Sequence, residues 1–300
     1  MTFTSTRPLT LWIPGGHGML GSRLAADARA AGHDVVVSGR EVDVADADAV
    51  AAFISVHHPQ AIVNCAAYTT VDKAEQEPEQ AQRLNAEAPG VVAAAAAVVG
   101  AKLVHVSTDY VFDGAGSAPL SEDTPTSPVS VYGRSKRDGE RAVFDANDNA
   151  VVVRTSWLYA ATHKNFVRTM LMLMADREHL RVVSDQRGRP TSTTTLSDAI
   201  LRLVDVDARG VVHVADETGA EGISWHDFAV AIREDAAARG LPMKVQGVEA
   251  IATAAYPTPA ARPAWSVFST ARYRELTGEA LPPWRQSLGL VLDAIVAAGS

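Results

Sequence analysis

Short apolar runs alternate with longer alanine-rich segments through the first half of the chain. The apolar runs are rich in β-branched residues and predict strands at 9–14, 35–38, 61–65, 102–107 and 150–154. The segments between them predict helices at 20–31, 45–57, 78–99 and 135–145. Strands that are apolar throughout, rather than at alternate positions, are typical of a parallel sheet with both faces covered. The alternation therefore predicts a doubly wound α/β domain over residues 1–155.

This rhythm breaks after residue 155. The pattern then predicts helices at 166–175, 198–204 and 225–239, and short strands at 181–183 and 211–215. Prolines within 256–259 and 262–263 predict loops, because proline neither continues a helix nor donates to a sheet. We expect residues 156–300 to form a smaller mixed α/β domain that mainly binds substrate, with the chain crossing back to the sheet near 181–204.

Composition limits the classes of function. The chain has 35 Asp+Glu against 27 Lys+Arg, a net charge of -8, which argues against sequence-independent binding to nucleic acid. Cys65 is the single cysteine, so an intramolecular disulfide is excluded, and we expect it to be a small buried hydrophobe. The longest apolar run, 91–99, is too short to span a bilayer. We expect a cytoplasmic protein without a membrane partner.

A glycine motif follows the first predicted strand. Gly15, Gly18 and Gly21 form G-x-x-G-x-x-G at the start of the first helix. The first two permit a tight turn and close approach to a pyrophosphate, and the third lets helix and sheet pack closely. The helix N-terminus adds N–H donors, so we expect Met19 and Leu20 to contact the phosphates as well. The motif in this context predicts a Rossmann site for a dinucleotide.

The end of the second strand should distinguish NAD from NADP. It reads Ser38-Gly39-Arg40, and an arginine here favours a 2′-phosphate. We therefore expect NADPH to be preferred, with NADH also usable; the alternative is a solvated arginine. Asp43 and Val44 would lie beside the adenine. We also expect three residues beyond the third strand to flank the cofactor: Ala66, Ala67 and Tyr68.

A reactive site is predicted from two further segments. Tyr132 and Lys136 form Y-x-x-x-K, a spacing of one helical turn that places both side chains on one face. A tyrosine acid stabilised by a neighbouring ammonium suits reduction of a carbonyl. Thr108 follows the fourth strand, where open α/β sheets bind their ligands, and can hydrogen-bond both a substrate oxygen and Tyr132. We predict these three residues as the catalytic trio.

These motifs resemble those of the extended short-chain dehydrogenase/reductases and, within them, the dTDP-4-dehydrorhamnose reductases. The resemblance covers nearly the whole chain. It rests on the glycine loop and on 63–75 (VNCAAYTTVDKAE), 107–114 (STDYVFDG), 127–136 (SPVSVYGRSK) and 154–159 (RTSWLY). It continues through Asn165-Phe166, 185–191 (DQRGRPT) and 255–263 (AYPTPAARP). The last three segments lie outside the cofactor domain and therefore point to the subfamily.

The resemblance implies reduction of the 4-keto group of dTDP-4-dehydro-β-L-rhamnose to dTDP-L-rhamnose, the last step of that sugar's synthesis. Tyr132 would protonate the alkoxide and Lys136 would bind the nicotinamide ribose. Thr108 and Asp109 would touch the sugar, and Trp157 would contact the substrate unless it is an ordinary core aromatic. Three arginines are candidates for the diphosphate: Arg187, Arg189 and Arg262. Some family members use Mg²⁺ at a dimer contact, so a homodimer is an expectation, although no ligand cluster in this sequence indicates the metal.

Several related functions compete with this one. Sugar-nucleotide dehydratases carry an acid after the Thr-Asp pair, where this chain has Tyr110. Epimerase-reductases need a Cys/His pair near the substrate, whereas Cys65 is expected on the cofactor side and His105 within a strand. A 4-ketoreductase for another dTDP-deoxysugar remains open. A non-catalytic subunit, similar to the regulatory β subunit of methionine adenosyltransferase, is opposed by the intact trio.

Overall fold

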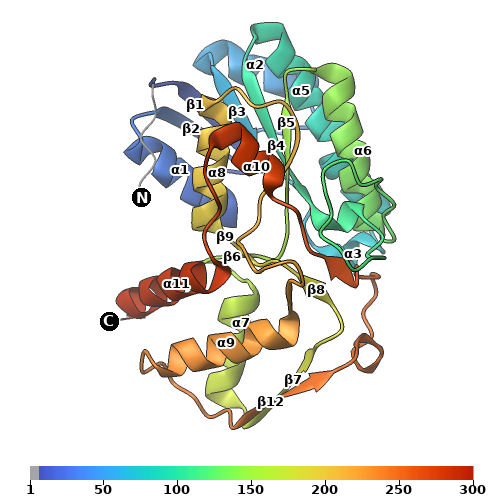
Figure 1. Ribbon diagram of the computed structural model, residues 1–300. Coiled ribbons are helices and arrows are strands. Elements are labelled where there is room, and N and C mark those ends of the chain that lie inside the picture. Colours follow the sequence, from blue (N-terminus) through green and yellow to red (C-terminus); the bar gives the residue numbers. More distant parts are fainter. Residues whose placement is uncertain (1–6, 300) are drawn as a thin grey trace.

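A six-stranded parallel sheet organises the computed structural model, which describes residues 7–299 (Figure 1). Its strand order is β10-β5-β4-β3-β1-β2. The bounds are β1 (Thr10–Pro14), β2 (Asp34–Ser38), β3 (Ala61–Asn64), β4 (Lys102–Thr108), β5 (Val151–Thr155) and β10 (Gly210–His213). The chain leaves β1 toward one edge and then runs from β3 toward the other, so the order reverses beside β1, where doubly wound folds bind ligands. The predicted fold class is confirmed.

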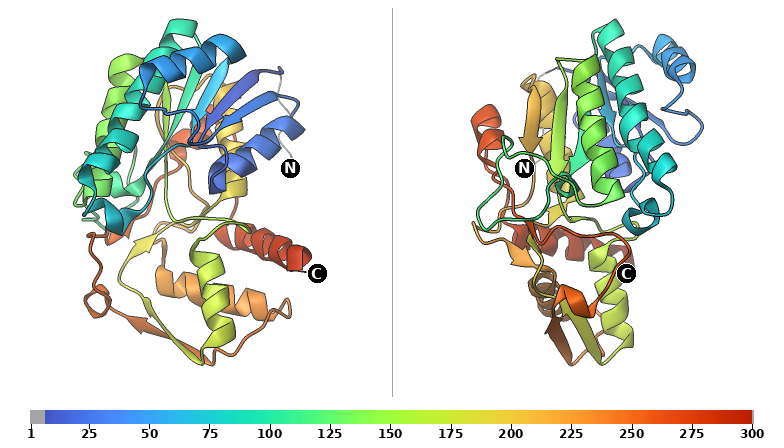
Figure 2. Two further views of the ribbon diagram at one scale, coloured as in Figure 1. Left: turned by 180° about the vertical axis from the view of Figure 1, so that it is seen from behind. Right: turned by 90° about the vertical axis from the view of Figure 1, so that its right-hand side faces the viewer.

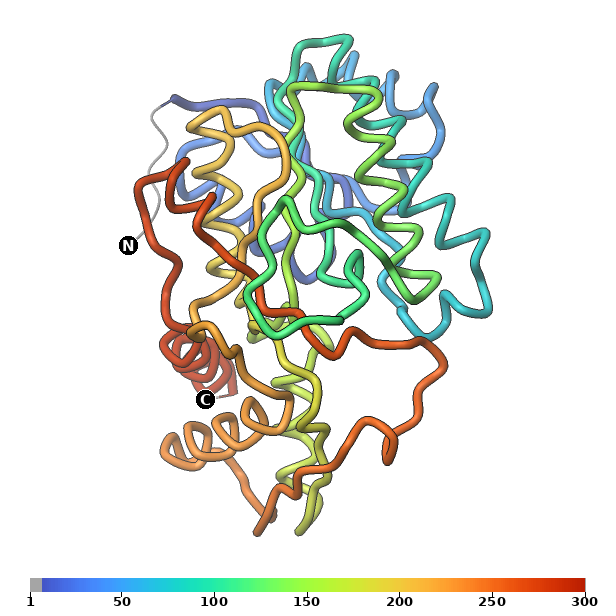
Figure 3. The backbone as a smooth tube through the Cα atoms, turned by 45° about the vertical axis from the view of Figure 1, so that its right-hand side comes forward, coloured from blue at the N-terminus to red at the C-terminus, as the bar shows by residue number. Residues whose placement is uncertain are grey.

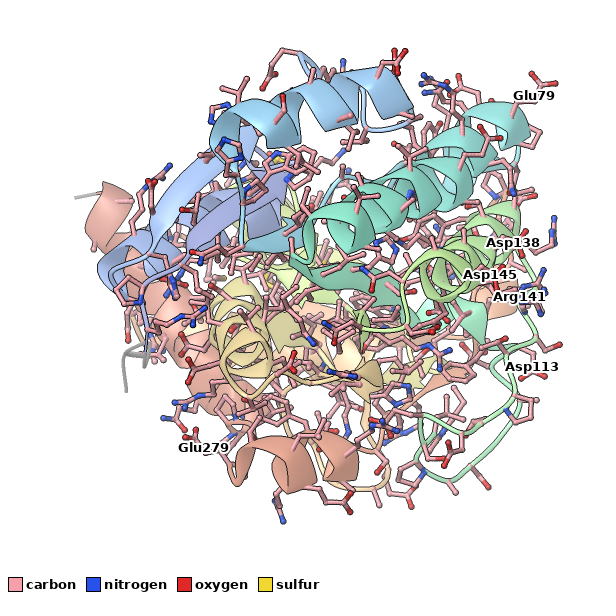
Figure 4. All side chains as sticks on the ribbon, turned by 90° about the horizontal axis from the view of Figure 1, so that it is seen from above. Glu79, Asp113, Asp138, Arg141, Asp145 and Glu279 are labelled. Carbon is pink, nitrogen blue, oxygen red and sulfur yellow. The ribbon has the colours of Figure 1, made fainter. Side chains whose placement is uncertain are left out.

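Helices cover both faces of the sheet (Figure 2). On one face, α1 (Met19–Ala30) and α8 (Thr193–Asp205) pack against each other and share a core with the strands. The other face carries α2 (Ala47–His57), α5 (Ala88–Val99) and α6 (Val131–Ala146). From above, the labelled charged side chains of α6, Asp138, Arg141 and Asp145, lie on its outer side (Figure 4). The strands are thus buried on both faces, as their continuous apolar sequences indicate.

The predicted helix 78–99 is interrupted. It consists of α4 (Pro78–Gln82), a π-helical turn η1 (Arg83–Glu87) and then α5. Pro89 has no N–H to donate to the carbonyl of Asn85, four residues earlier, which explains why the regular ladder is lost here. Gly139 of α6 uses this opening, because a Cβ at that position would lie only 1.9 Å from the Asn85 carbonyl oxygen.

Two helices begin earlier than predicted, because serine caps set their first turns. The Ser130 side chain accepts a hydrogen bond from Gly133 N at 3.1 Å, so α6 begins at residue 131 rather than 135. The Ser192 side chain accepts from Thr195 N at 3.0 Å, so α8 begins at 193 rather than 198. Each cap satisfies an N–H group of the first turn, which has no partner within the helix.

A second lobe lies below the sheet (Figure 1). Its helices are α7 (Phe166–Asp176), α9 (Trp225–Ala237) and α11 (Trp284–Gly299), and β7 (His179–Val183) pairs in parallel with β12 (Gly247–Ile251). One apolar core joins them and includes Met174, Phe228 and Leu292. Helix α11 was absent from our sequence prediction, although Pro283 and the apolar positions 288, 291, 292 and 295 mark it.

The chain passes between the lobes several times. Short strand pairs form the junction: β6 (Leu158–Tyr159) with β9 (Thr191–Ser192), and β8 (Arg187–Gly188) between β11 (Ile223–Ser224) and β13 (Trp265–Ser266). The chain returns to the sheet through α8 and β10, and later through α10 (Ala271–Thr277), which packs against both. The remaining short helices are α3 (Val71–Ala74), η2 (Asp109–Val111) and η3 (Thr253–Ala255).

The loop between η2 and α6 lies along the chain that returns from the second lobe (Figure 3). Leu120 N donates to Val267 O at 2.8 Å, and Ser269 N donates to Leu120 O at 2.7 Å. The Trp265 indole N–H donates to Ala118 O at 2.8 Å. These bonds attach residues 265–269 to the sheet lobe. Within residues 7–299, no helix has the length and apolarity needed to cross a membrane.

Candidate active site

The loop between β1 and α1 presses glycines against neighbouring backbone. Gly15 has φ of +74°, and a Cβ there would lie 2.7 Å from Ala66 N. A Cβ at Gly21 would lie 2.3 Å from the Gly15 carbonyl oxygen. No side chain caps α1 at Gly18, so the N–H groups of the first turn can bind an anion. The loop fits the pyrophosphate of a dinucleotide. Two further predicted residues begin α1: Met19 and Leu20.

An arginine and an acid stand together at the end of β2. Arg40 is exposed, and among the described residues its side chain has no hydrogen-bond or ion-pair partner. The Glu41 carboxylate accepts a hydrogen bond from Gly39 N, and this bond lowers its pKa, with a smaller contribution from the nearby His17. Glu41 was not among our predicted site residues. The strand end thus offers a cation for a 2′-phosphate and a carboxylate able to bind a ribose hydroxyl.

The residues predicted beside the adenine have protein partners. Asp43 forms an ion pair with Arg83 of η1, and hydrogen bonding from Arg83 is the main reason that its pKa is lowered. The Val44 side chain is buried in the core between the sheet and α2. Their contact with adenine stays a prediction.

Asn85 of η1 holds the segment that follows β3. Its side-chain oxygen accepts from Tyr68 N at 2.8 Å, and its amide nitrogen donates to Tyr68 O at 3.0 Å. The same nitrogen donates to the Ser135 hydroxyl of α6 at 3.1 Å. Asn85 thereby fixes the segment Ala66-Ala67-Tyr68 relative to α6. Sequence reasoning missed this residue, and the signal available was Pro89 inside a predicted helix.

The predicted catalytic trio meets where β4 and α6 adjoin. Tyr132 and Lys136 both lie in α6 and are buried, and Thr108 ends β4. Burial raises the pKa of Tyr132 to about 12, against a hydrogen bond with Thr108 that lowers it. Burial also lowers the pKa of Lys136 to about 8. We expected a neighbouring ammonium to dominate the tyrosine's pKa; in the structure burial has the larger effect, and the phenol keeps its proton at neutral pH.

Thr108 and Asp109 form a connected pair. The Thr108 hydroxyl donates to Asp109 Oδ1 at 3.0 Å and accepts from Tyr110 N at 3.3 Å. Asp109 is buried, and burial raises its pKa to about 6, opposed mainly by a hydrogen bond from Ser266 of the returning chain. The rings of Tyr110 and Tyr132 meet edge to face with centroids 5.3 Å apart. The proton of the threonine thus points at Asp109.

A buried ion pair anchors α6 to the sheet. Glu140 accepts from Arg154 of β5 through both carboxylate oxygens, at 2.9 and 2.6 Å, and from the Ser107 hydroxyl of β4 at 2.6 Å. The Arg154 guanidinium also lies 5.1 Å from the ring centre of Phe112. These bonds satisfy two opposite charges that burial would otherwise make costly. Glu140 was not predicted, because the contact links three elements far apart in sequence.

Trp157 lies in the second lobe, at the junction. Its ring stacks on that of Trp225, with centroids 3.5 Å apart and planes 10° from parallel. Gly188 lies against the edge of the Trp157 ring: a Cβ at Gly188 would be 2.7 Å from a ring carbon of Trp157. From the same lobe, His163 Nε2 lies 3.3 Å from the carbonyl oxygen of His17 in the glycine loop. The second lobe therefore reaches the glycine loop, while the role of Trp157 in binding substrate stays a prediction.

The three arginines predicted for the diphosphate are engaged within the protein. Arg187 donates to the carbonyl oxygens of Glu221 and Gly222. The buried Arg189 pairs with Glu217 at 2.8 Å. Arg262 forms a bidentate ion pair with Asp72, at 3.0 and 2.8 Å, which attaches the returning chain to α3. A diphosphate would have to compete with these partners, and the assignment stays a prediction.

Two other sequence expectations concern reactive groups. Cys65 is partly buried against the main core, and burial raises the pKa of its thiol to about 12, which suppresses the reactive thiolate. Across residues 7–299, no group of three or more His, Cys, Asp or Glu side chains could hold a metal ion. The Mg²⁺ site at a dimer contact that the resemblance implied stays a prediction.

Comparison with known proteins decides the family. The sequence profile described as "RmlD substrate binding domain" matches residues 9–297. The chain belongs to the RmlD family. A dTDP-4-dehydrorhamnose reductase of Burkholderia thailandensis is 40% identical over 300 residues, covering 96% of this chain and 100% of that protein. A dTDP-4-dehydrorhamnose reductase of Bacillus anthracis, solved in complex with NADP, superposes with a TM-score of 0.90 at 35% identity, covering 96% of this chain and 100% of that one.

Sequence identity to this chain is nearly the same for two relatives whose names give different substrates. A protein of Streptomyces antibioticus described as a probable dTDP-4,6-dihydroxy-2-methyloxan-3-one 4-ketoreductase is 41% identical over 289 residues, covering 95% of each chain. That identity equals, within a percentage point, the identity to the Burkholderia reductase. Overall similarity therefore supports the family without choosing between these two sugars.

Proposed function

We propose that this protein reduces the 4-keto group of dTDP-4-dehydro-β-L-rhamnose to give dTDP-L-rhamnose, using a nicotinamide dinucleotide. One observation carries the proposal: Thr108, Tyr132 and Lys136 adjoin at the carboxyl end of β4, on the same edge of the sheet as the glycine loop. A carbonyl between them would face an acid, a cation and a hydride donor together. Membership of the RmlD family supports the sugar-nucleotide assignment.

A bound nicotinamide would supply the hydride, and the chain's own residues would manage the proton. Tyr132 keeps its proton at neutral pH because burial raises its pKa to about 12. An alkoxide forming at C4 is a stronger base than a phenolate, so the proton passes to it from the tyrosine. Lys136 would hold the nicotinamide ribose, while Thr108 and Asp109 would orient the sugar. Exclusion of water by the buried site strengthens each of these interactions.

We further propose that NADPH is preferred and that NADH is also used. The guanidinium of Arg40, exposed and without a partner among residues 7–299, supports a contact with the 2′-phosphate. Glu41, beside it, supports use of NADH, because a carboxylate can accept a hydrogen bond from a free 2′-hydroxyl.

The second candidate is a 4-ketoreductase for another dTDP-deoxysugar, favoured by the 41% identity to the Streptomyces antibioticus protein. The residues predicted to contact the substrate do not distinguish the two candidate substrates. Thr108 and Asp109 would contact any sugar whose 4-keto group lies at this site. The choice depends on which hydroxyl and methyl groups the second lobe accepts.

The deciding experiment is an assay of NADPH oxidation with enzymatically generated dTDP-4-dehydrorhamnose, with the product identified by NMR. Rapid oxidation that yields dTDP-L-rhamnose would establish the reaction and its stereochemistry at C4. Oxidation only with another dTDP-4-keto sugar would select the second candidate. Cofactor binding without turnover of any such sugar would contradict both and favour a non-catalytic role.

Three organisational features belong to the same proposal. Residues 1–155, with α8 and β10, would bind the dinucleotide, and most of 156–300 would bind the sugar nucleotide. The protein would act in the cytoplasm, where nucleotide sugars are made. It would form a homodimer, which light scattering of the purified protein would test.

A further inference from the structure

His105 lies behind the lysine of the catalytic trio. On β4, His105 and Ser107 face α6, where they meet Lys136 and Glu140 respectively. Two residues along a strand and four residues along a helix both span about 6 to 7 Å. The spacing of His105 and Ser107 on β4 therefore matches that of Lys136 and Glu140 on α6. His105 is fully buried. The proposed mechanism assigns it no role.

Hydrogen bonding fixes the position of the proton on His105. The Asn64 side-chain oxygen accepts from Ala66 N at 3.1 Å, which leaves the Asn64 amide nitrogen facing His105 Nδ1 at 3.3 Å. An amide nitrogen only donates, so Nδ1 must accept. Burial lowers the pKa of His105 well below its usual value, and the ring is therefore neutral. A neutral ring whose Nδ1 accepts carries its proton on Nε2.

That Nε2–H group points at Lys136. The two nitrogens are 3.4 Å apart, and the lysine donates a hydrogen bond to Val106 O at 2.7 Å. An N–H donor cannot bond to an ammonium, which has no lone pair, but it can bond to a neutral amine. The arrangement therefore favours the neutral form of Lys136.

Other groups around Lys136 act on its charge as well. Burial lowers its pKa most, whereas the Glu140 carboxylate on α6 and Cys65 beyond β3 raise it. The charge of Glu140 is itself matched by Arg154 of β5 at 2.6 Å. Tyr132, one turn earlier on α6, is uncharged at neutral pH. The carboxylate of Glu140 is thus already paired, and His105 faces the lysine from β4.

We propose that His105 is a positioning residue that stabilises the neutral amine of Lys136 after the lysine has passed a proton to Tyr132. The proposal rests on the proposed reduction. The Tyr132 O–H bond breaks as a bond forms between that proton and the C4 oxygen, and Lys136 then returns one proton to the phenolate. The lone pair left on the lysine nitrogen accepts the His105 Nε2–H, and a proton from solvent restores the ammonium between turnovers.

The tautomer can be observed directly by ¹⁵N NMR of the wild-type protein. The expected spectrum shows His105 protonated on Nε2 and neutral across pH 6 to 9. His213 provides an internal control, because it is also fully buried but its Nδ1 lies 3.1 Å from Leu120 O and must carry the proton. A His105 proton on Nδ1, or a doubly protonated ring, would overturn the proposal.

Variants test the effect on the lysine. In His105→Gln the amide oxygen can face Lys136 and favour the ammonium. We therefore expect the alkaline limb of the pH profile, measured for both NADPH affinity and kcat/KM, to move up by about one pH unit. His213→Gln replaces a buried histidine remote from Lys136 and should leave the limb in place. If the midpoint of the alkaline limb is unchanged in His105→Gln, the role of His105 is purely structural and the proposal is overturned. This holds even if the variant loses rate or stability.

Two of these readouts need no sugar. The tautomer and the pH dependence of NADPH binding, followed by the fluorescence of bound NADPH, report on His105 even if the substrate assignment fails. A wild-type protein that binds NADPH with the expected pH dependence but does not reduce dTDP-4-dehydrorhamnose would contradict the proposed function alone. The reverse result, reduction with an unshifted limb in His105→Gln, would contradict the role of His105 alone.

Discussion

Tyr132 and Lys136 share one face of α6, and burial moves their pKa values in opposite directions. The phenol rises to about 12 and the ammonium falls to about 8, because both side chains lose hydration of their charged forms. At neutral pH the tyrosine is therefore a secure proton donor, and the lysine is the more acidic of the two. A phenolate formed during reduction would recover its proton from the lysine.

Replacing Tyr132 by phenylalanine removes the proton donor and little else. We expect kcat to fall by at least ~10²-fold, the usual scale for the loss of a general acid. Affinity for NADPH, measured by fluorescence titration, should change little. Tyr273→Phe, in α10 and also buried, is the matched control and should keep full activity. Near-normal turnover in Tyr132→Phe would exclude this residue as the acid.

Arg40→Ala tests cofactor choice. Loss of a charge-assisted contact with the 2′-phosphate should weaken NADPH binding by roughly tenfold or more and leave NADH affinity unchanged. Dissociation constants for both cofactors, measured by calorimetry, give the answer. Arg177→Ala, an exposed arginine of the second lobe, serves as the control. An unaltered ratio of the two affinities in Arg40→Ala would show that this arginine does not read the 2′-phosphate.

The residues predicted for the catalytic trio share one property: each lies at the end of a strand or at a fixed spacing within one helix. Tyr132 and Lys136 are one turn apart, and Thr108 directly follows an apolar run, so a linear pattern reveals them. Asn85 and Glu140 contact partners on other elements. Those partners are so far away in sequence that the pattern of apolar residues does not reveal the contacts. Pro89 signalled a break near Asn85, but the contacts of both residues follow only from the packing of η1, α6 and the sheet.

At the scale of elements, the sequence predicted which segments are helices and strands better than where they begin. The starts of α6 and α8 depend on single serine caps within segments of low helix propensity, which apolar periodicity does not register. The break in the 78–99 helix follows from Pro89, a local signal that was available. The short strands β6, β8, β9, β11 and β13 have two residues each and exist only because the lobes meet there.

The attachment of α6 to the sheet can be measured through Glu140. Glu140→Gln leaves Arg154 buried without its counter-charge, which should lower the free energy of unfolding by roughly 3 to 5 kcal/mol. Urea denaturation measures the change. Glu234 provides the control, because its pair with Arg285 is about half exposed and Glu234→Gln should cost under about 1 kcal/mol. Equal losses in the two variants would mean that the buried pair does not anchor the helix.

At the scale of the molecule, a buried acid marks the junction of the lobes. Asp216 accepts a hydrogen bond from Ser192 N at 3.2 Å, where β9 meets α8. Three hydroxyl side chains, Tyr159 of β6, Thr195 of α8 and Ser287 of α11, favour the ionised form of its carboxyl group and so oppose the effect of burial on its pKa. Burial raises the pKa of Asp216 to about 7. The carboxyl group is thus protonated in the folded protein over a range where the unfolded chain would ionise it.

This difference makes the stability of the junction depend on pH. A raised folded-state pKa contributes stability that is fully present below the unfolded value, near 4, and is lost as pH rises through about 7. The free energy of unfolding of the wild type, relative to Asp216→Asn, should fall by on the order of a few kcal/mol between pH 4 and 8. Urea denaturation at several pH values tests this. Parallel curves for the two proteins would show that Asp216 ionises normally.

The path of the chain has a consequence for how the protein can be made. Strand β10 forms an edge of the sheet beside β5, yet the chain between them builds much of the second lobe. A growing polypeptide therefore cannot finish its sheet until about two thirds of it has been synthesised. A fragment cut after β5 would present a bare strand edge, which readily recruits other chains. We therefore expect that neither lobe folds as an independent fragment. A permuted or split version of the protein must keep β5 and β10 in the same fragment.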